Sequence, residues 1–169
     1  MSSDSLKLRT LEKEDFDALI AIENDAQLWP FSLQTEPYSK EILWEYINAQ
    51  NRDIYDVGQR RFVISNQDQN VLGFVDLFYF EPTHRRAGVG IVIREPYRNR
   101  GFAKRALFLL EELCINQYKM KNLYCNIGID NHVSVRLFAS CGYRRVGVKK
   151  AWNFFNGNFH DEYLYQKQL

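Results

Sequence analysis

The ten residues Arg94-Glu95-Pro96-Tyr97-Arg98-Asn99-Arg100-Gly101-Phe102-Ala103 join two segments of very different pattern. Residues 87–93, before them, form a short β-branched apolar run, which predicts a central strand. Residues 103–114, after them, carry apolar side chains at helical spacing, which predicts a long amphipathic helix. Its solvent face is predicted to carry Lys104, Arg105, Glu111 and Glu112. A strand, a glycine-containing loop and a helix therefore follow one another here.

The loop between these two segments is suited to hold a phosphate. Gly101 and Ala103 allow another molecule to approach the backbone closely. The first N–H groups of a helix lack internal partners and lie at the positive end of the helix dipole. Together with Arg98 and Arg100 they would form a cradle for a pyrophosphate. Taken alone, these residues fit a helix start with two solvated arginines equally well.

The rest of the chain predicts a mixed α/β fold. Thr10 follows a short alternating strand and is a candidate helix cap, as is Ser39 further on. Further strands are predicted at residues 61–65, 71–80, 123–127 and 143–148, and a helix at residues 133–140 that ends at Gly142. Asn156-Gly157 predicts a hairpin turn near the C-terminus.

Length and composition exclude several classes of protein. The 169 residues, 46% of them hydrophobic, predict one domain spanning residues 1–169. Lys and Arg number 22 against 21 Asp and Glu, so we expect no nucleic-acid partner. No apolar run approaches the roughly 18 residues of a membrane span, and no signal peptide is visible. Three cysteines without a CxxC pair predict reduced thiols, no metal site and a cytoplasmic location.

Two motifs resemble those of the GNAT family of N-acetyltransferases. Arg98-x-x-Gly101-x-Ala103 is similar to the acetyl-CoA signature of that family. Asn131-x-x-Ser134-x-x-Leu137-Phe138-x-x-x-Gly142-Tyr143 resembles a second family element at the expected distance. Stretches that resemble the spermidine/spermine branch in particular are Glu36-Pro37-Tyr38, Arg60-Arg61-Phe62-Val63, His84-Arg85-Arg86-Ala87 and Phe155-Asn156-Gly157. The ribosomal-protein N-terminal acetyltransferases share much of this layout.

The resemblance implies a fold, a co-substrate and a reaction. The fold is an α/β (α+β) arrangement with a mixed, mostly antiparallel sheet of six to seven strands and about four flanking helices. The sheet is splayed at its centre, between residues 87–93 and 123–127, and acetyl-CoA lies in the splay. The implied cofactor-binding residues are Ile91, Val92, Ile93, Arg98, Asn99, Arg100, Gly101, Phe102, Ala103, Asn131, Ser134 and Phe138. The reaction is transfer of the acetyl group to a primary amine, such as that of the polyamine spermidine.

The position at which the family usually has its general acid, the group that protonates the leaving coenzyme thiolate, departs from the family pattern in this chain. The family usually has a tyrosine at the position of Phe138, and phenylalanine cannot donate a proton. Three alternatives stay open: the coenzyme thiolate leaves unassisted, Ser134 or Cys141 on the same helix face donates the proton, or the protein binds acyl-CoA and catalyses poorly.

Three polar residues are candidates for contacts with the amine that accepts the acetyl group. Asp76 lies in an otherwise apolar strand, so it attracts the cationic amine, relays its proton through water, or faces solvent. Glu36 and His84 are candidate substrate contacts, although each fits an exposed loop or turn equally well. A protein N-terminal acetyltransferase and a non-catalytic acyl-CoA-binding module are the alternative functions. We also expect a homo-oligomer, a dimer or larger, with pairing through the C-terminal hairpin, and no membrane partner.

Overall fold

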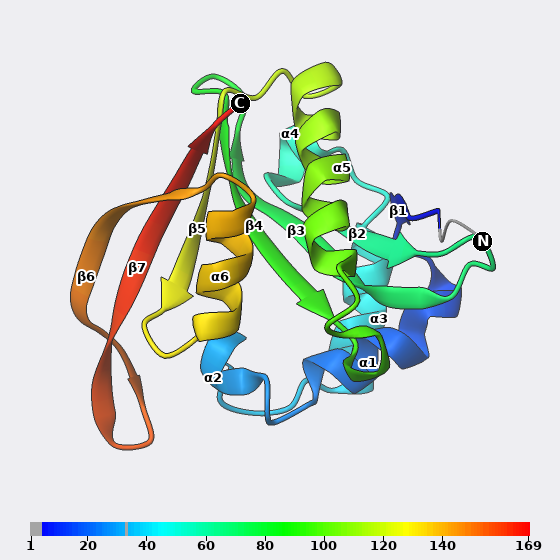
Figure 1. Ribbon diagram of the computed structural model, residues 1–169. Helices are drawn as coiled ribbons and strands as arrows, with labels where there is room; N and C mark the ends of the chain where they lie inside the picture. Colours follow the sequence, from blue (N-terminus) through cyan, green and yellow to red (C-terminus); the bar gives the residue numbers. More distant parts are fainter. Residues whose placement is uncertain (1–4, 33) are drawn as a thin grey trace.

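The computed structural model describes residues 5–32 and 34–169, and its centre is a seven-stranded sheet (Figure 1). The strand order is β1-β2-β3-β4-β5-β7-β6. All neighbouring strands are antiparallel except β4 and β5, which are parallel. The strands are β1 (Lys7–Thr10), β2 (Arg60–Ser65), β3 (Val71–Glu81), β4 (Arg86–Ile93), β5 (Asn122–Gly128), β6 (Arg144–Phe155) and β7 (Asn158–Gln168). The predicted fold class is confirmed.

Helices cover both faces of this sheet (Figure 1). They are α1 (Phe16–Glu23), α2 (Trp29–Ser32), α3 (Lys40–Ala49), α4 (Ile54–Val57), α5 (Phe102–Asn116) and α6 (His132–Ser140), with 3₁₀ turns η1 (Lys13–Asp15) and η2 (Glu95–Tyr97). Alternate residues of β3 face opposite ways, so Phe74 packs with α1 and α3 while Val75 and Leu77 pack with α5. The sheet is therefore buried on two sides along β3 and β4.

The sheet is splayed where β4 and β5 meet. The two strands pair only over Arg86–Gly88 and Asn122–Tyr124. Beyond Gly88 they diverge toward their carboxyl ends, as Figure 1 shows, while β4 stays paired with β3 as far as Ile93. Within the described residues, the edge of β4 at residues 89–93 that faces β5 carries no ladder partner. The predicted splay is confirmed.

Several local predictions are confirmed. The Ser39 side chain caps α3 by accepting a hydrogen bond from the N–H of Ile42. Gly142 ends α6 with a φ of +89°, a conformation that favours glycine. The β6–β7 strands pair up to the Asn156-Gly157 turn, where Phe155 faces Asn158.

Two local predictions are wrong. Thr10 does not cap a helix, because Glu12 and Asp15 form the capping box there and Asp15 is held by Arg9 at 2.7 Å. Glu111 is not on the solvent face of α5: it is buried and bound to Lys167 Nζ at 2.6 Å. Helical periodicity cannot show that a lysine 56 residues away supplies a partner for a carboxylate.

No helix in residues 5–32 or 34–169 combines the length and the apolar character that a membrane crossing requires.

Candidate active site

The loop before α5 leaves the start of that helix open. Arg98 Nε donates a hydrogen bond to the carbonyl oxygen of Ile93 at 2.9 Å, which ties the loop to the end of β4. Gly101 is the N-cap residue of α5, with a φ of +78° and no capping side chain. A Cβ built on Gly101 would meet no atom within 4 Å among the described residues. The first amides of α5 are thus available to an anion.

Basic side chains surround this helix start. The guanidinium groups of Arg100 and Arg105 lie 5.1 and 5.8 Å from the centre of the Phe102 ring. The Phe102 ring itself is buried in the core, so its backbone N–H is the part that a cofactor can reach. Arg98 and Asn99 are exposed, and Asn99 has a φ of +60°. The loop predicted to bind the cofactor therefore offers backbone amides and two cations at one point.

The second predicted cofactor segment lies on α6. The Asn131 side chain caps this helix, since its Oδ1 accepts a hydrogen bond from Ser134 N at 3.2 Å. Ser134 is half-buried. Phe138 is buried, and its ring meets that of Tyr143 edge-on with the centroids 5.0 Å apart.

The residues around the splay fit acetyl-CoA. The open edge of β4 offers hydrogen-bonding groups to a pantetheine chain at the half-buried Ile91 and Val92, with the buried Ile93 at its end. The uncapped helix start and the open space beside Gly101 suit a pyrophosphate. When bound, acetyl-CoA supplies the acetyl group as a thioester.

The two candidate replacements for the missing tyrosine hydroxyl differ in burial. Cys141 is buried, its Sγ is 4.0 Å from Ser140 Oγ, and burial raises the pKa of its thiol. Tyr143 carries a hydroxyl close to Phe138, but that oxygen is buried without a hydrogen-bond partner among the described residues. Burial, with smaller effects from Glu111 and nearby thiols, raises the pKa of Tyr143. The more accessible Ser134 and the buried Cys141 stay predictions as proton donors.

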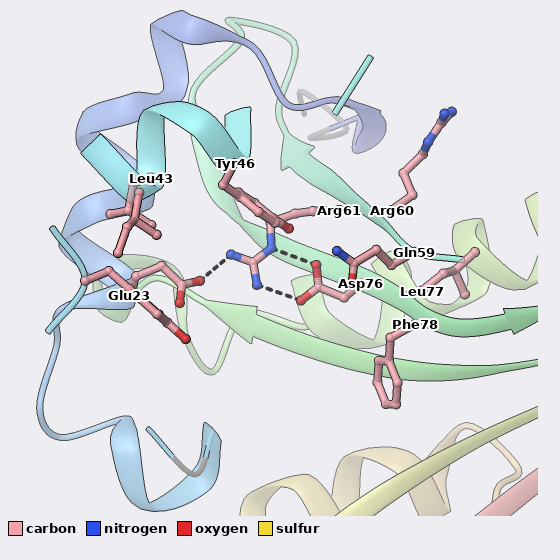
Figure 2. A pocket seen from close by; sticks show the side chains of 11 residues that line it. Glu23, Leu43, Tyr46, Gln59, Arg60, Arg61, Asp76, Leu77 and Phe78 are labelled. Atoms are coloured by element: carbon pink, nitrogen blue, oxygen red, sulfur yellow. Dashed lines mark hydrogen bonds and ion pairs between the residues drawn. The ribbon is translucent and has the colours of Figure 1, made fainter. Parts of the chain in front are cut away.

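A cavity of about 340 Å³ opens on the face of β3 that α1 and α3 cover, opposite the face that packs against α5 (Figure 2). We call it the acceptor cavity. It is lined by Glu23, Tyr38, Ile42, Leu43, Tyr46, Gln59, Arg60, Arg61, Asp76, Leu77 and Phe78.

A buried arginine organises the polar part of the acceptor cavity. Arg61 donates from Nε to Asp76 Oδ1 at 2.7 Å and from Nη2 to Asp76 Oδ2 at 2.9 Å. Its third nitrogen, Nη1, pairs with Glu23 Oε1 (Figure 2). Burial alone would lower the pKa of Arg61, but the charge and hydrogen bonds of Asp76 outweigh it and hold that pKa well above its ordinary value. Two carboxylates around one guanidinium leave this group with a formal charge of −1.

Asp76 also connects the cavity with the splayed strand. It pairs with Gly90 across the β3–β4 ladder, and a Cβ on Gly90 would lie 3.9 Å from Asp76 Oδ2. Arg61 binds both oxygens of the half-buried Asp76, so this carboxylate is paired with a cation rather than directed freely into solvent. Among the described residues, nothing donates a hydrogen bond to Glu23 Oε2, so that oxygen is the open carboxylate position in the cavity.

The other two predicted substrate contacts lie outside this cavity. Glu36 is exposed in the segment before α3, two residues from the cavity-lining Tyr38. His84 is exposed in the β3–β4 turn. Glu23 and Tyr46, in contrast, line the cavity and were not indicated by any motif, because they come from helices that meet β3 only in the folded chain.

Comparison with known proteins agrees with this arrangement. Residues 5–144 match the family model described as an acetyltransferase (GNAT) domain. A spermidine N(1)-acetyltransferase of Vibrio cholerae is 27% identical over 156 residues, which cover 92% of this chain and 88% of the relative. A crystal structure of spermidine N-acetyltransferase from V. cholerae in complex with CoA and spermine superposes with a TM-score of 0.89 at 24% identity, covering 99% and 96% of the two chains. A dodecameric structure of the V. cholerae enzyme gives a TM-score of 0.80 at 25% identity, covering 99% and 95%.

The chain therefore belongs to the GNAT acetyltransferase family. It is an acyl-CoA-dependent N-acetyltransferase, and acetyl-CoA is its co-substrate.

Proposed function

We propose that this enzyme acetylates a primary amine of a polyamine such as spermidine, bound in the acceptor cavity. The observation that carries the proposal is the pair Glu23 and Asp76 around Arg61, next to Gly90 of the splayed strand. The surplus negative charge of Glu23, Asp76 and Arg61 suits a cationic acceptor. Arg60, which also lines the cavity, donates instead to the carbonyl oxygen of Arg52. The relatives named as spermidine acetyltransferases support the same substrate class.

The two carboxylates of the acceptor cavity have distinct parts in the proposal. The amine must lose a proton before it attacks, because an alkylammonium has a pKa near 10.4. Asp76, fully bound by Arg61, acts through its charge and fixes the guanidinium. Glu23 Oε2 receives a hydrogen bond from the incoming ammonium and passes its proton to water.

The attack joins the amine nitrogen to the acetyl carbon and breaks the carbon–sulfur bond. Backbone N–H groups near Ile91–Ile93 would stabilise the negative oxygen that develops on the acetyl group. The electron pair leaves on the coenzyme sulfur. A thiol pKa near 8.5 makes departure as thiolate feasible without a tyrosine.

The proposal is tested by thiol release. Protein and acetyl-CoA are mixed with spermidine, spermine, amino acids, aminoglycosides or short peptides, and free coenzyme thiol is measured. We expect turnover with the polyamines first. Turnover with peptides alone would favour the protein N-terminal alternative, which calls for a free edge strand beside the cavity. The cavity lining contains no described residue of the two outer strands, β1 and β6.

We further propose that the enzyme is one acetyltransferase domain that assembles into a cytoplasmic homo-oligomer. The β6–β7 hairpin exposes the rings of Trp152, Phe154 and Phe159, an apolar surface that a second copy of the chain could cover. The three described thiols are free, as in a reducing compartment. The dodecamer of the V. cholerae enzyme is a precedent for assembly. Light scattering of wild type and Phe154→Asp tests it: the proposal expects a multimer that the substitution weakens, and a monomeric wild type contradicts it.

A further inference from the structure

A second cavity adjoins the acceptor cavity along β3. Its volume is about 630 Å³, and Gln59 and Phe78 line both cavities. The remaining lining residues are Val57, Gly58, Tyr79, Phe80, Glu81 and Tyr124. The two spaces meet at the Phe78 ring.

The Phe78 ring is seated on a glycine. A Cβ on Gly88 would lie 2.2 Å from Phe78 Cε2, so no other residue at position 88 leaves the ring where it is. Phe78 then meets the ring of Tyr124 on β5 edge-on, with centroids 6.1 Å apart. This arrangement places an aromatic wall at the point where β4 and β5 are still paired.

The backbone next to Phe78 is strained. The β3–β4 register shifts between Phe78 and Glu81, and Tyr79 within this bulge has a φ of +44°. A tyrosine rarely adopts such an angle, which costs about 1–3 kcal/mol. The bulge directs the Tyr79 side chain toward the edge of the cavity. This side chain is 73% exposed, and the centre of its ring lies 5.7 Å from that of Phe78. Bulges of this kind re-aim side chains beside active sites.

The chemistry of these groups suits an organic cation. Three aromatic rings lie together at residues 78, 79 and 124, and each ring presents a face that attracts positive charge. The carboxylate of Glu81 lines the same cavity, although Arg86 is bound to it. We call Phe78, Tyr79, Glu81 and Tyr124 the distal subsite. Asp76 and Phe78 are two residues apart on the regular part of β3, which is about 7 Å along a strand.

We propose that the distal subsite binds the second ammonium group of a linear di- or polyamine whose first amine is at Glu23 and Asp76. The inference rests on the proposed function and adds a specificity determinant to it: two cationic groups separated by an aliphatic chain are required, and a monoamine fills only half of the site.

The test compares Tyr79→Ala with wild type on two amines, spermidine and butylamine. Binding to the protein saturated with CoA is measured by calorimetry, and turnover with acetyl-CoA by thiol release. We expect Tyr79→Ala to weaken spermidine binding and raise its KM about tenfold, the size of one cation–π contact. Butylamine and acetyl-CoA kinetics should not change. Tyr79→Phe keeps the ring and should retain most of the affinity.

Phe108→Ala is the matched control. This ring is also exposed but lies on α5, on the other face of the sheet, so its removal should leave both amines unaffected. Equal spermidine affinity in wild type and Tyr79→Ala overturns the distal subsite while leaving the proposed function standing. Weaker spermidine binding in Tyr79→Ala, with no turnover in any variant, supports the subsite and overturns the proposed function. A parallel loss for spermidine and butylamine also overturns the subsite, because it shows a general effect on the cavity.

Discussion

The two sides of the splayed strand β4 are built in opposite ways. The coenzyme side consists mainly of backbone, namely an uncapped helix start, an open strand edge and a glycine next to open space, with Arg100 and Arg105 nearby. The acceptor side consists of side chains from α1, α3, β2 and β3, held by one buried arginine. Backbone geometry recognises a ligand part that does not change between reactions, while a set of side chains can be altered for each acceptor.

The largest expected effect is on the coenzyme side. Gly101→Glu places a carboxylate in the space that we assign to the pyrophosphate, so we expect acetyl-CoA binding to become undetectable by calorimetry. The fold should survive, since nothing described lies within 4 Å of the new Cβ.

Gly157→Glu is the matched control for this change. Gly157 has a φ of +75° and equally open surroundings at the tip of the β6–β7 hairpin. Both variants should lose similar stability from the strained φ, but only Gly101→Glu should lose acetyl-CoA. Unchanged affinity in Gly101→Glu would contradict the assigned cradle.

The same contrast explains what the sequence could predict. The loop at 98–103 could be located because its parts are contiguous and together match a family motif, whereas the glycine, the small residue and the helix start alone fit a solvated loop equally well. The splay followed from the family resemblance and the order of strands. Asp76 could be singled out as a polar residue in an apolar strand, but its pairing with Arg61 could not be predicted from the sequence.

Glu23 and the pairing of Asp76 with Arg61 escaped prediction because these contacts are long-range. Glu23 is 38 residues from Arg61, and Asp76 is 15 residues from it. The exposed Glu36 and His84 matched the family pattern without lining the cavity. A motif records which residues recur, whereas the partner of a buried charge depends on how two helices pack on a sheet.

The second largest expected effect is a loss of protein stability caused by a substitution on the acceptor side. Arg61→Met leaves Glu23 and Asp76 facing each other with no cation between them, so we expect the free energy of unfolding to fall by about 3–5 kcal/mol in urea. Acetyl-CoA affinity of the folded fraction should remain, because the coenzyme side shares no side chain with this group.

Arg86→Met serves as its control. Arg86 also pairs with a carboxylate, Glu81, but both side chains are largely exposed, and we expect little change in stability. An equal decrease in the free energy of unfolding of the two variants would show that the buried Arg61 ion pair contributes no more to stability than the exposed Arg86 pair.

A smaller effect appears only at alkaline pH. Burial raises the pKa of Tyr46 to about 12, an increase that Arg61 opposes and the two carboxylates favour. Below pH 10 the phenol is protonated in both the folded and the unfolded chain. Between pH 10 and 12 the unfolded chain releases this proton first, so stability falls by about 3 kcal/mol. Urea titrations across this range should show a steeper fall in wild type than in Tyr46→Phe, and parallel curves would be evidence against a desolvated Tyr46.

The smallest effect, on catalysis itself, joins the two sides at the leaving sulfur. Phe138→Tyr restores a hydroxyl at the position where the family usually has one, and we expect kcat to rise about tenfold. The gain should stay below the 10²–10⁴ of an established general acid, because Phe138 is packed edge-on against Tyr143 and nothing in this chain has been selected to orient a new hydroxyl. Tyr143→Phe is the control: it removes a buried hydroxyl without a described partner, so it should leave kcat unchanged and increase stability by about 1 kcal/mol. An unchanged kcat in a folded Phe138→Tyr that still binds acetyl-CoA would mean that thiolate departure needs no proton from this position, which leaves unassisted departure, Ser134 and Cys141 as the alternatives.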